Sequence, residues 1–155
     1  GFRGLTRLNG QEFTAMELIK DSVDYIIFAI LGLMGFVTVW LTIERLLFLR
    51  SVKPSGYADK DSYDKALTDN LTTLYIIYSN APYVGLLGTV IGIMITFYDM
   101  GQSGNINASD IMTGLSLALK ATALGLAVAI PTLVIYNGLQ RRINVLSAQW
   151  KDAAK

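Results

Sequence analysis

The sequence predicts an all-α integral membrane protein with three transmembrane helices. Of its 155 residues, 52% are hydrophobic and 16% are charged, whereas a soluble domain carries about 25% charged residues. Three long apolar runs, none with more than one charged residue, alternate with short polar segments. Because each run is long enough to cross a bilayer as a helix, composition and pattern indicate the same class.

The composition also excludes several functions. The chain contains no cysteine and no histidine, which removes the thiol nucleophile, the commonest general base and the commonest transition-metal ligand. A formal net charge of +1 provides no broad basic surface for nucleic acid. We therefore expect no enzyme activity, no catalytic residue, no metal site, no cofactor and no nucleic-acid partner.

The first apolar run follows a polar N-terminal stretch. Residues 1–15 are mixed and polar, and Met16 opens a different kind of sequence, so we expect residues 1–15 to be an artificial remnant of expression. Residues 16–50 are predicted to hold the first transmembrane helix. The uncharged stretch from Tyr25 to Ile43 would be about 28 Å long as a helix, which matches a hydrocarbon core of about 30 Å.

The second apolar run is longer than a bilayer requires. Residues 51–70 are predicted to be a short loop, and the second helix is predicted over 71–98, about 42 Å long. Part of this helix should therefore project from the membrane. Pro82 lies where polar sequence gives way to apolar sequence, and it is a candidate hinge.

The third apolar run follows a polar connector over 99–110. A third helix is predicted over 111–142, with an apolar part about 43 Å long, and residues 143–155 form a polar tail. Pro131 inside this helix is a second candidate hinge.

The basic residues predict the orientation. Five Lys or Arg lie between Arg45 and Lys65 and four lie in residues 141–155, whereas the 99–110 connector has none. By the positive-inside rule, the two basic segments are cytoplasmic and the connector is outside. Three spans then place the N-terminus outside and the C-terminus in the cytoplasm, and the two long helices extend on the cytoplasmic side.

Small residues recur at steps of three and four along the second and third helices, so they lie on one face of each. Such stripes let helix backbones approach closely in lipid. Thr89 and Thr122 fall on the same stripes, where their hydroxyls either bond to a carbonyl one turn earlier or line a wet path. The glycines expected to pack helices are Gly85, Gly88, Gly92, Gly114 and Gly125.

The charges inside the spans limit what this chain can do alone. The three runs lack Asp, Glu and His, and Lys120 is their only charged residue. Proton relays through membranes generally use carboxylates or imidazoles, so a partner would have to supply a relay acid. Lys120 either snorkels toward the outer headgroups, pairs with a neighbouring chain or faces a pore, and these alternatives stay open. Arg141 and Arg142 are expected to meet anionic phospholipid headgroups as topology determinants, rather than as a specific lipid site.

Two segments resemble the second and third membrane helices of ExbB and TolQ proteins. They are APYVGLLGTVIGIM, residues 81–94, and GLSLALKATALGLAVAIP, residues 114–131, followed by Tyr136 and Asn137. The resemblance implies a subunit of the bacterial inner membrane, with a periplasmic N-terminus, that forms a homopentameric ring around the helices of an ExbD-like partner. It also implies that the proton motive force drives a TonB-like protein and outer-membrane uptake. The family's pore threonines fall on Thr89 and Thr122, and its relay Asp lies on the partner.

The chain departs from this family pattern in three places. Leu117 stands where many relatives carry a Glu, Lys120 stands where many are apolar, and the loop is short. A mechanism that requires that Glu is therefore not expected. A TolQ-like subunit of the Tol-Pal system and a non-conducting scaffold for ExbD and TonB are the alternatives. A MotA-type flagellar stator is disfavoured because its cytoplasmic region is larger.

Overall fold

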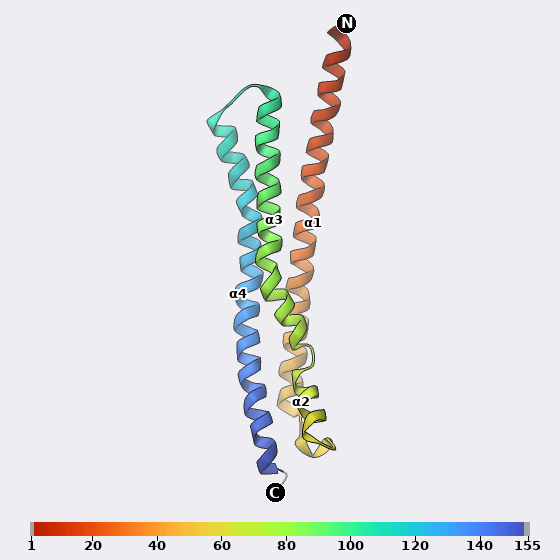
Figure 1. Cartoon of the computed structure of the whole chain (residues 1–155), viewed down its shortest axis with the longest axis vertical. Coiled ribbons are helices and arrows are strands. Elements are labelled where there is room, and N and C mark those ends of the chain that lie inside the picture. Colours follow the sequence, from red (N-terminus) through yellow and green to blue (C-terminus); the bar gives the residue numbers. More distant parts are fainter. Residues whose placement is uncertain (1, 154–155) are drawn as a thin grey trace. The chain divides into compact units, whose positions relative to one another are not determined.

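The computed structural model describes the backbone of residues 2–153 and the side chains of residue 15 and residues 17–150, and every regular element in this range is helical. In chain order the elements are α1 (Phe2–Ser51), the 3-10 helix η1 (Pro54–Gly56), α2 (Lys60–Thr68), α3 (Leu71–Ser103) and α4 (Ala108–Ala153) (Figure 1). Three helices, α1, α3 and α4, are long and apolar enough to cross a membrane. The prediction of an all-α protein with three long apolar helices is confirmed.

The helices extend further than the apolar runs that predicted them. Because α3 continues to Ser103 and α4 begins at Ala108, residues 104–107 separate them, rather than the whole 99–110 segment. Polar residues can continue a helix beyond an uncharged run, because the hydrogen bonds of a helix are made by its backbone. Gly104 has a φ of +65°, a left-handed conformation that glycine adopts without strain and that commonly ends helices.

The N-terminal end of α1 and the C-terminal end of α4 also extend beyond the predicted spans. The backbone of α1 is helical from Phe2, within the expected artificial remnant, whereas the side chains before residue 15 lie outside the described part of the chain. Residues 143–153, predicted as tail, continue α4. Both α3 and α4 pass through their prolines, Pro82 and Pro131, so neither proline starts a new helix.

Helix packing forms two compact units, each with its own contacts. The first unit contains residues 1–32 and 82–126, and thus the first part of α1, most of α3 and the first part of α4. The second unit contains residues 33–81 and 127–155. The short helices η1 and α2 therefore belong entirely to the second unit.

The second unit has a hydrophobic core to which α2 contributes. Tyr63 and Leu67 of α2 and Leu74 of α3 are almost fully buried. The Tyr63 ring lies 5.3 Å from the Tyr57 ring and 5.2 Å from the Trp150 ring, measured between centroids. The stretch predicted as a loop is thus held by its apolar side chains against the longer helices. The core residues are Leu49, Tyr63, Leu67, Leu71, Leu74, Leu139 and Ile143.

Arg45 of α1 is buried in the same unit, with an exposed fraction of 3%. Its guanidinium donates to the Ala66 carbonyl at 2.9 Å, forms a salt bridge with Glu44 and lies 4.4 Å from the Phe48 ring centroid. Glu44 in turn accepts a hydrogen bond from Asn70 Nδ2 at 3.3 Å. A buried charge needs such partners to offset its lost hydration. Arg45 thus joins α1 to α2, and its partner Glu44 joins α1 to the turn that follows α2.

Asp59 caps the N-terminus of α2. Its side chain accepts a hydrogen bond from the Ser62 backbone N–H at 2.7 Å, which satisfies one free amide of the first turn. The bond stabilises the carboxylate, and so it lowers the pKa of Asp59 below the ordinary value for aspartate.

We expect acidification to loosen the start of α2. Because the folded-state pKa is lowered, the cap contributes fully above the unfolded-state pKa, and its contribution is lost as the pH falls through the folded-state pKa. The hydrogen-exchange protection of the Ser62 amide should decrease over that pH range. Asp59→Asn can still cap but does not titrate, so its protection should not follow this pH dependence. Identical pH profiles for the two proteins would contradict the assignment.

Candidate functional site

In the first unit, α3 and α4 approach so closely that backbone meets backbone. A Cβ placed on Gly85 would lie 2.6 Å from the Ala121 carbonyl oxygen and 3.1 Å from the Cα atoms of Thr122 and Gly125. These distances are shorter than the separation of about 3.5–4.0 Å at which non-bonded carbon atoms attract each other, so the atoms would repel each other. Only glycine therefore fits at position 85 unless the two helices move apart.

Two further glycines of α3 lie along the same contact. A Cβ on Gly88 would lie 2.9 Å from the Ala121 Cβ, and a Cβ on Gly92 would lie 2.9 Å from the Ala118 Cβ. Glycine on α3 thus faces alanine on α4 at successive turns, the arrangement that lets helices associate in lipid.

Thr96 and Gly114 meet further along this contact, toward the residues that join the two helices. A Cβ on Gly114 would lie 2.5 Å from Thr96 Cγ2 and 2.6 Å from its Oγ1. The Thr96 hydroxyl donates to the Gly92 carbonyl one turn earlier, at 2.9 Å. Thr96 therefore makes the local bond that is common for a threonine in a membrane helix.

Thr89 and Thr122 lie opposite each other across the contact, and their hydroxyl oxygens are 2.5 Å apart. The Thr89 hydroxyl is also 2.9 Å from the Ala118 carbonyl oxygen on α4 and 3.3 Å from the Gly85 carbonyl oxygen on α3. Thr89 is enclosed, with an exposed fraction of 5%, whereas Thr122 is half-buried. The structure thus brings the two candidate threonines into direct contact.

The carbonyl contacts of Thr89 favour one direction for the hydrogen bond of this pair. Each hydroxyl has one proton, and a carbonyl oxygen can only accept a hydrogen bond. If Thr89 donates its one proton to the nearer carbonyl, that of Ala118, it must accept the proton of Thr122, and the more distant Gly85 carbonyl receives no proton from this pair. Thr122 then keeps a lone pair on its half-buried side, where it can accept a hydrogen bond from water or from another chain.

Four other residues singled out from the sequence make no hydrogen bond to the hydroxyl pair. Lys120 is exposed and forms no salt bridge with any described side chain, and Leu117 is 51% exposed. Pro82 is half-buried and Pro131 is exposed. Within the described residues, no three His, Cys, Asp or Glu side chains gather as a metal site would require.

A second threonine pair, in the second unit, is absent from the sequence-based predictions. Thr38 of α1 and Thr132 of α4 have hydroxyl oxygens 3.2 Å apart, and Thr132 is fully buried. Thr132 also lies 2.7 Å from the Val128 carbonyl oxygen and Thr38 lies 2.9 Å from that of Met34. A single threonine in an apolar run does not indicate which residue its hydroxyl contacts. This contact could be predicted only if the packing of α1 against α4 were already known.

Comparison with known proteins gives one family and several relatives. The pattern of the MotA/TolQ/ExbB proton channel family matches residues 57–152, which include the whole α3–α4 contact. A Helicobacter pylori (strain J99) protein named biopolymer transport protein ExbB is 58% identical over 137 residues, 88% of this chain and 94% of that protein. Its namesake in Aquifex aeolicus (strain VF5) is 48% identical over 136 residues, 88% of this chain and 92% of that protein. The Pseudomonas putida namesake is 47% identical over 81 residues, 52% of this chain but 25% of that protein.

Proposed function

The chain belongs to the MotA/TolQ/ExbB proton channel family, and from this membership we propose that it is the ExbB-type subunit of a complex that energises TonB-dependent uptake. Relatives that align with nearly their whole length carry the ExbB name, which favours this system over Tol-Pal. In this proposal the chain lies in the bacterial inner membrane, with its N-terminus in the periplasm and its C-terminus in the cytoplasm. The cytoplasmic ends of α3 and α4 extend beyond the bilayer.

The observation that carries the proposal is the hydroxyl pair of Thr89 and Thr122. The pair lies in apolar runs that contain no carboxylate and no imidazole. Hydroxyls can order water, but a relay also needs a group that gains and loses protons. The pair therefore suits the wall of a proton path whose titrating group comes from another chain.

The partner that fits this chemistry is an ExbD-like protein with a single membrane helix and a relay Asp. We place that helix inside a homopentamer of this chain, with the half-buried side of Thr122 turned toward it. A proton that moves down a potential of 100 mV releases about 2.3 kcal/mol. The complex would transmit this energy through the partner to a TonB-like protein.

Proton flux in liposomes tests whether the relay acid belongs to the partner and not to this chain. We expect this chain alone to conduct few protons, and the chain with its ExbD-like partner to conduct many more. A partner whose relay Asp is replaced by Asn should return the flux to the level of this chain alone. Substantial flux through this chain alone would contradict the proposal that the relay acid lies elsewhere.

A non-conducting scaffold for ExbD and TonB is the second candidate, and one observation favours it. The Thr89 hydroxyl is enclosed and has all its hydrogen-bond partners within the chain, as a purely structural threonine would. Removal of the hydroxyls distinguishes the two functions, because a scaffold requires only that the complex assemble.

A further inference from the structure

Lys120 is a cation without a counter-ion in the described part of the chain. It lies in the apolar run of α4, it is exposed, and it forms no salt bridge with a described side chain. It precedes Thr122 by two residues, which is about 200° around the helix, so it faces away from the hydroxyl pair. A charge among membrane-spanning residues is costly unless it is paired. Lys120 therefore calls for an acidic group on a surface other than the one that Thr122 presents.

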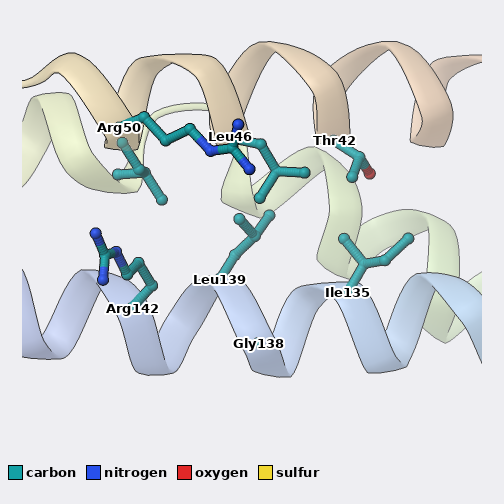
Figure 2. A pocket seen from close by; sticks show the side chains of 8 residues that line it. Thr42, Leu46, Arg50, Ile135, Gly138, Leu139 and Arg142 are labelled. Carbon is teal, nitrogen blue, oxygen red and sulfur yellow. The ribbon is translucent and has the colours of Figure 1, made fainter.

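In the second unit, α1 and α4 run side by side in the same direction. The hydroxyl oxygens of Thr38 and Thr132 are 3.2 Å apart. Further along both helices, Leu46 and Leu139 point toward each other (Figure 2). The two pairs occur in the same order along the two helices, and a residue of α4 follows its α1 counterpart by about 94 positions.

The same offset appears in the first unit, and it gives the level of Lys120. A Cβ on Gly88 would lie 2.9 Å from the Ala121 Cβ and 3.1 Å from Ile27 Cγ2, so Ile27 and Ala121 lie at one level. Asp24 precedes Ile27 by three residues, and Lys120 precedes Ala121 by one. Since a helix rises 1.5 Å per residue, Asp24 and Lys120 differ in level by about 3 Å. A lysine side chain is long enough to span that difference.

Asp24 belongs to an acidic face of α1. Glu17, Asp21 and Asp24 follow one another at steps of four and three, so they lie on one face of the helix. None of the three forms a salt bridge with a described side chain, and neither does Lys20 between them. This stretch therefore carries a net negative charge, and it ends at the level of Lys120, whose charge is opposite.

The face of α4 around Lys120 suits contact with another helix. Ser116 and Ala123 lie one turn before and one turn after Lys120, and like Lys120 they are exposed. Small side chains let helices approach closely in lipid. A closed ring rotates its copies about one axis, which leaves every residue at its own depth. A neighbouring copy would thus present its Asp24 at the level of Lys120.

We propose that Lys120 forms a salt bridge with Asp24 of a neighbouring copy of this chain. The inference rests on the proposed assembly of identical copies into a ring, but it does not depend on proton conduction. The pair would join α4 of one copy to α1 of the next. The ExbD-like helix is a poorer occupant, because it is placed beside Thr122, on the other side of α4.

Cross-linking between two differently tagged copies tests the proximity of the two residues. The chain contains no cysteine, so introduced thiols react without background. When Lys120→Cys in one copy is co-expressed with Asp24→Cys in the other, a short bismaleimide should give a product that carries both tags. Leu119→Cys, at an adjacent exposed position, is the matched control for Lys120→Cys and should give far less of this product. Equal yields, or no product with both tags, would overturn the pair.

Native mass spectrometry of the wild-type protein separates this failure from failure of the proposed assembly. A ring of several copies without the two-tag product would overturn the salt bridge alone. A single copy would overturn the assembly, and with it the salt bridge.

Exchange of the two charges tests the salt bridge itself. Lys120→Asp or Asp24→Lys alone would bring like charges together, and each should lower the assembled fraction in detergent by about fivefold, equivalent to about 1 kcal/mol. Lys120→Asp with Asp24→Lys should restore assembly. Lys120→Asp with Glu17→Lys, on the same face of α1 but about 10 Å from Asp24 along the helix, should not. Circular dichroism should show the same helical content in all variants, and failure of the exchanged pair to restore assembly would overturn the proposal.

Discussion

Gly85→Leu is expected to prevent the protein from accumulating in the membrane, and Gly85→Ala is expected to lower its free energy of unfolding by about 3 kcal/mol. Even the single methyl of alanine would lie 2.6 Å from the Ala121 carbonyl oxygen. Backbone atoms of an intact helix cannot rotate away as a side chain can, so this substitution lies at the upper end of the cost of overpacking. Unfolding in detergent, followed by circular dichroism, measures the loss.

Gly101 provides the control for the Gly85 experiment. It lies in the same helix, and a Cβ there would meet no atom within 4 Å. Gly101→Ala should keep or slightly raise stability, because alanine is the better helix former. If Gly85→Ala were as stable as the wild type, the close approach of α3 to α4 at this point would be wrong.

Removal of both hydroxyls of the pair, by Thr89→Val and Thr122→Val, is expected to reduce proton-driven uptake by about tenfold or more, equivalent to about 1.4 kcal/mol in a barrier. Valine keeps the shape of threonine, and a lost hydrogen bond costs about 1 kcal/mol of stability. The complex should therefore still assemble. Uptake of a labelled iron–siderophore measures function, and co-purification of the ExbD-like partner measures assembly.

Two controls separate the loss of hydroxyls from other effects of the valines. Thr89→Ser with Thr122→Ser keeps both hydroxyls and should retain most of the uptake. Thr96→Val removes a hydroxyl that bonds locally to the Gly92 carbonyl in the same helix, and it should have little effect. Normal uptake in the double valine variant would reject the channel function and support the scaffold.

The small-residue faces of α3 and α4 could be predicted from the sequence because their spacing follows the helix period. Gly85, Gly88 and Gly92 repeat at steps of three and four, and the structure places each against α4. The direct contact of Thr89 with Thr122 could not be predicted, since each hydroxyl had a plausible local partner one turn earlier. Only the register between the two helices decides which oxygen each hydroxyl meets.

The contacts of Arg45, in the second unit, could not be predicted either, because they depend on how α2 packs against α1. By the positive-inside rule, Arg45 is one of the basic residues that orient the chain in the membrane. In the structure its side chain is buried and donates a hydrogen bond to the Ala66 carbonyl. This contact requires the chain to return from Ser51 to α2, so that Ala66 faces Arg45. The chain turns again at Asn70, which has a φ of +64°. Asparagine tolerates that conformation, but nothing in the local sequence requires it.

The close approach at Gly85 also has a mechanical consequence. Rotation of α3 alone would drive a bulkier side chain into the Ala121 carbonyl, and it would separate Thr89 from both of its partners on α4. Packed interfaces resist such gradual deformation, because their atoms have no free volume to move into. Any motion that proton flow drives in this part of the molecule should therefore move α3 and α4 together as one rigid body, with displacement occurring at their contacts with other chains.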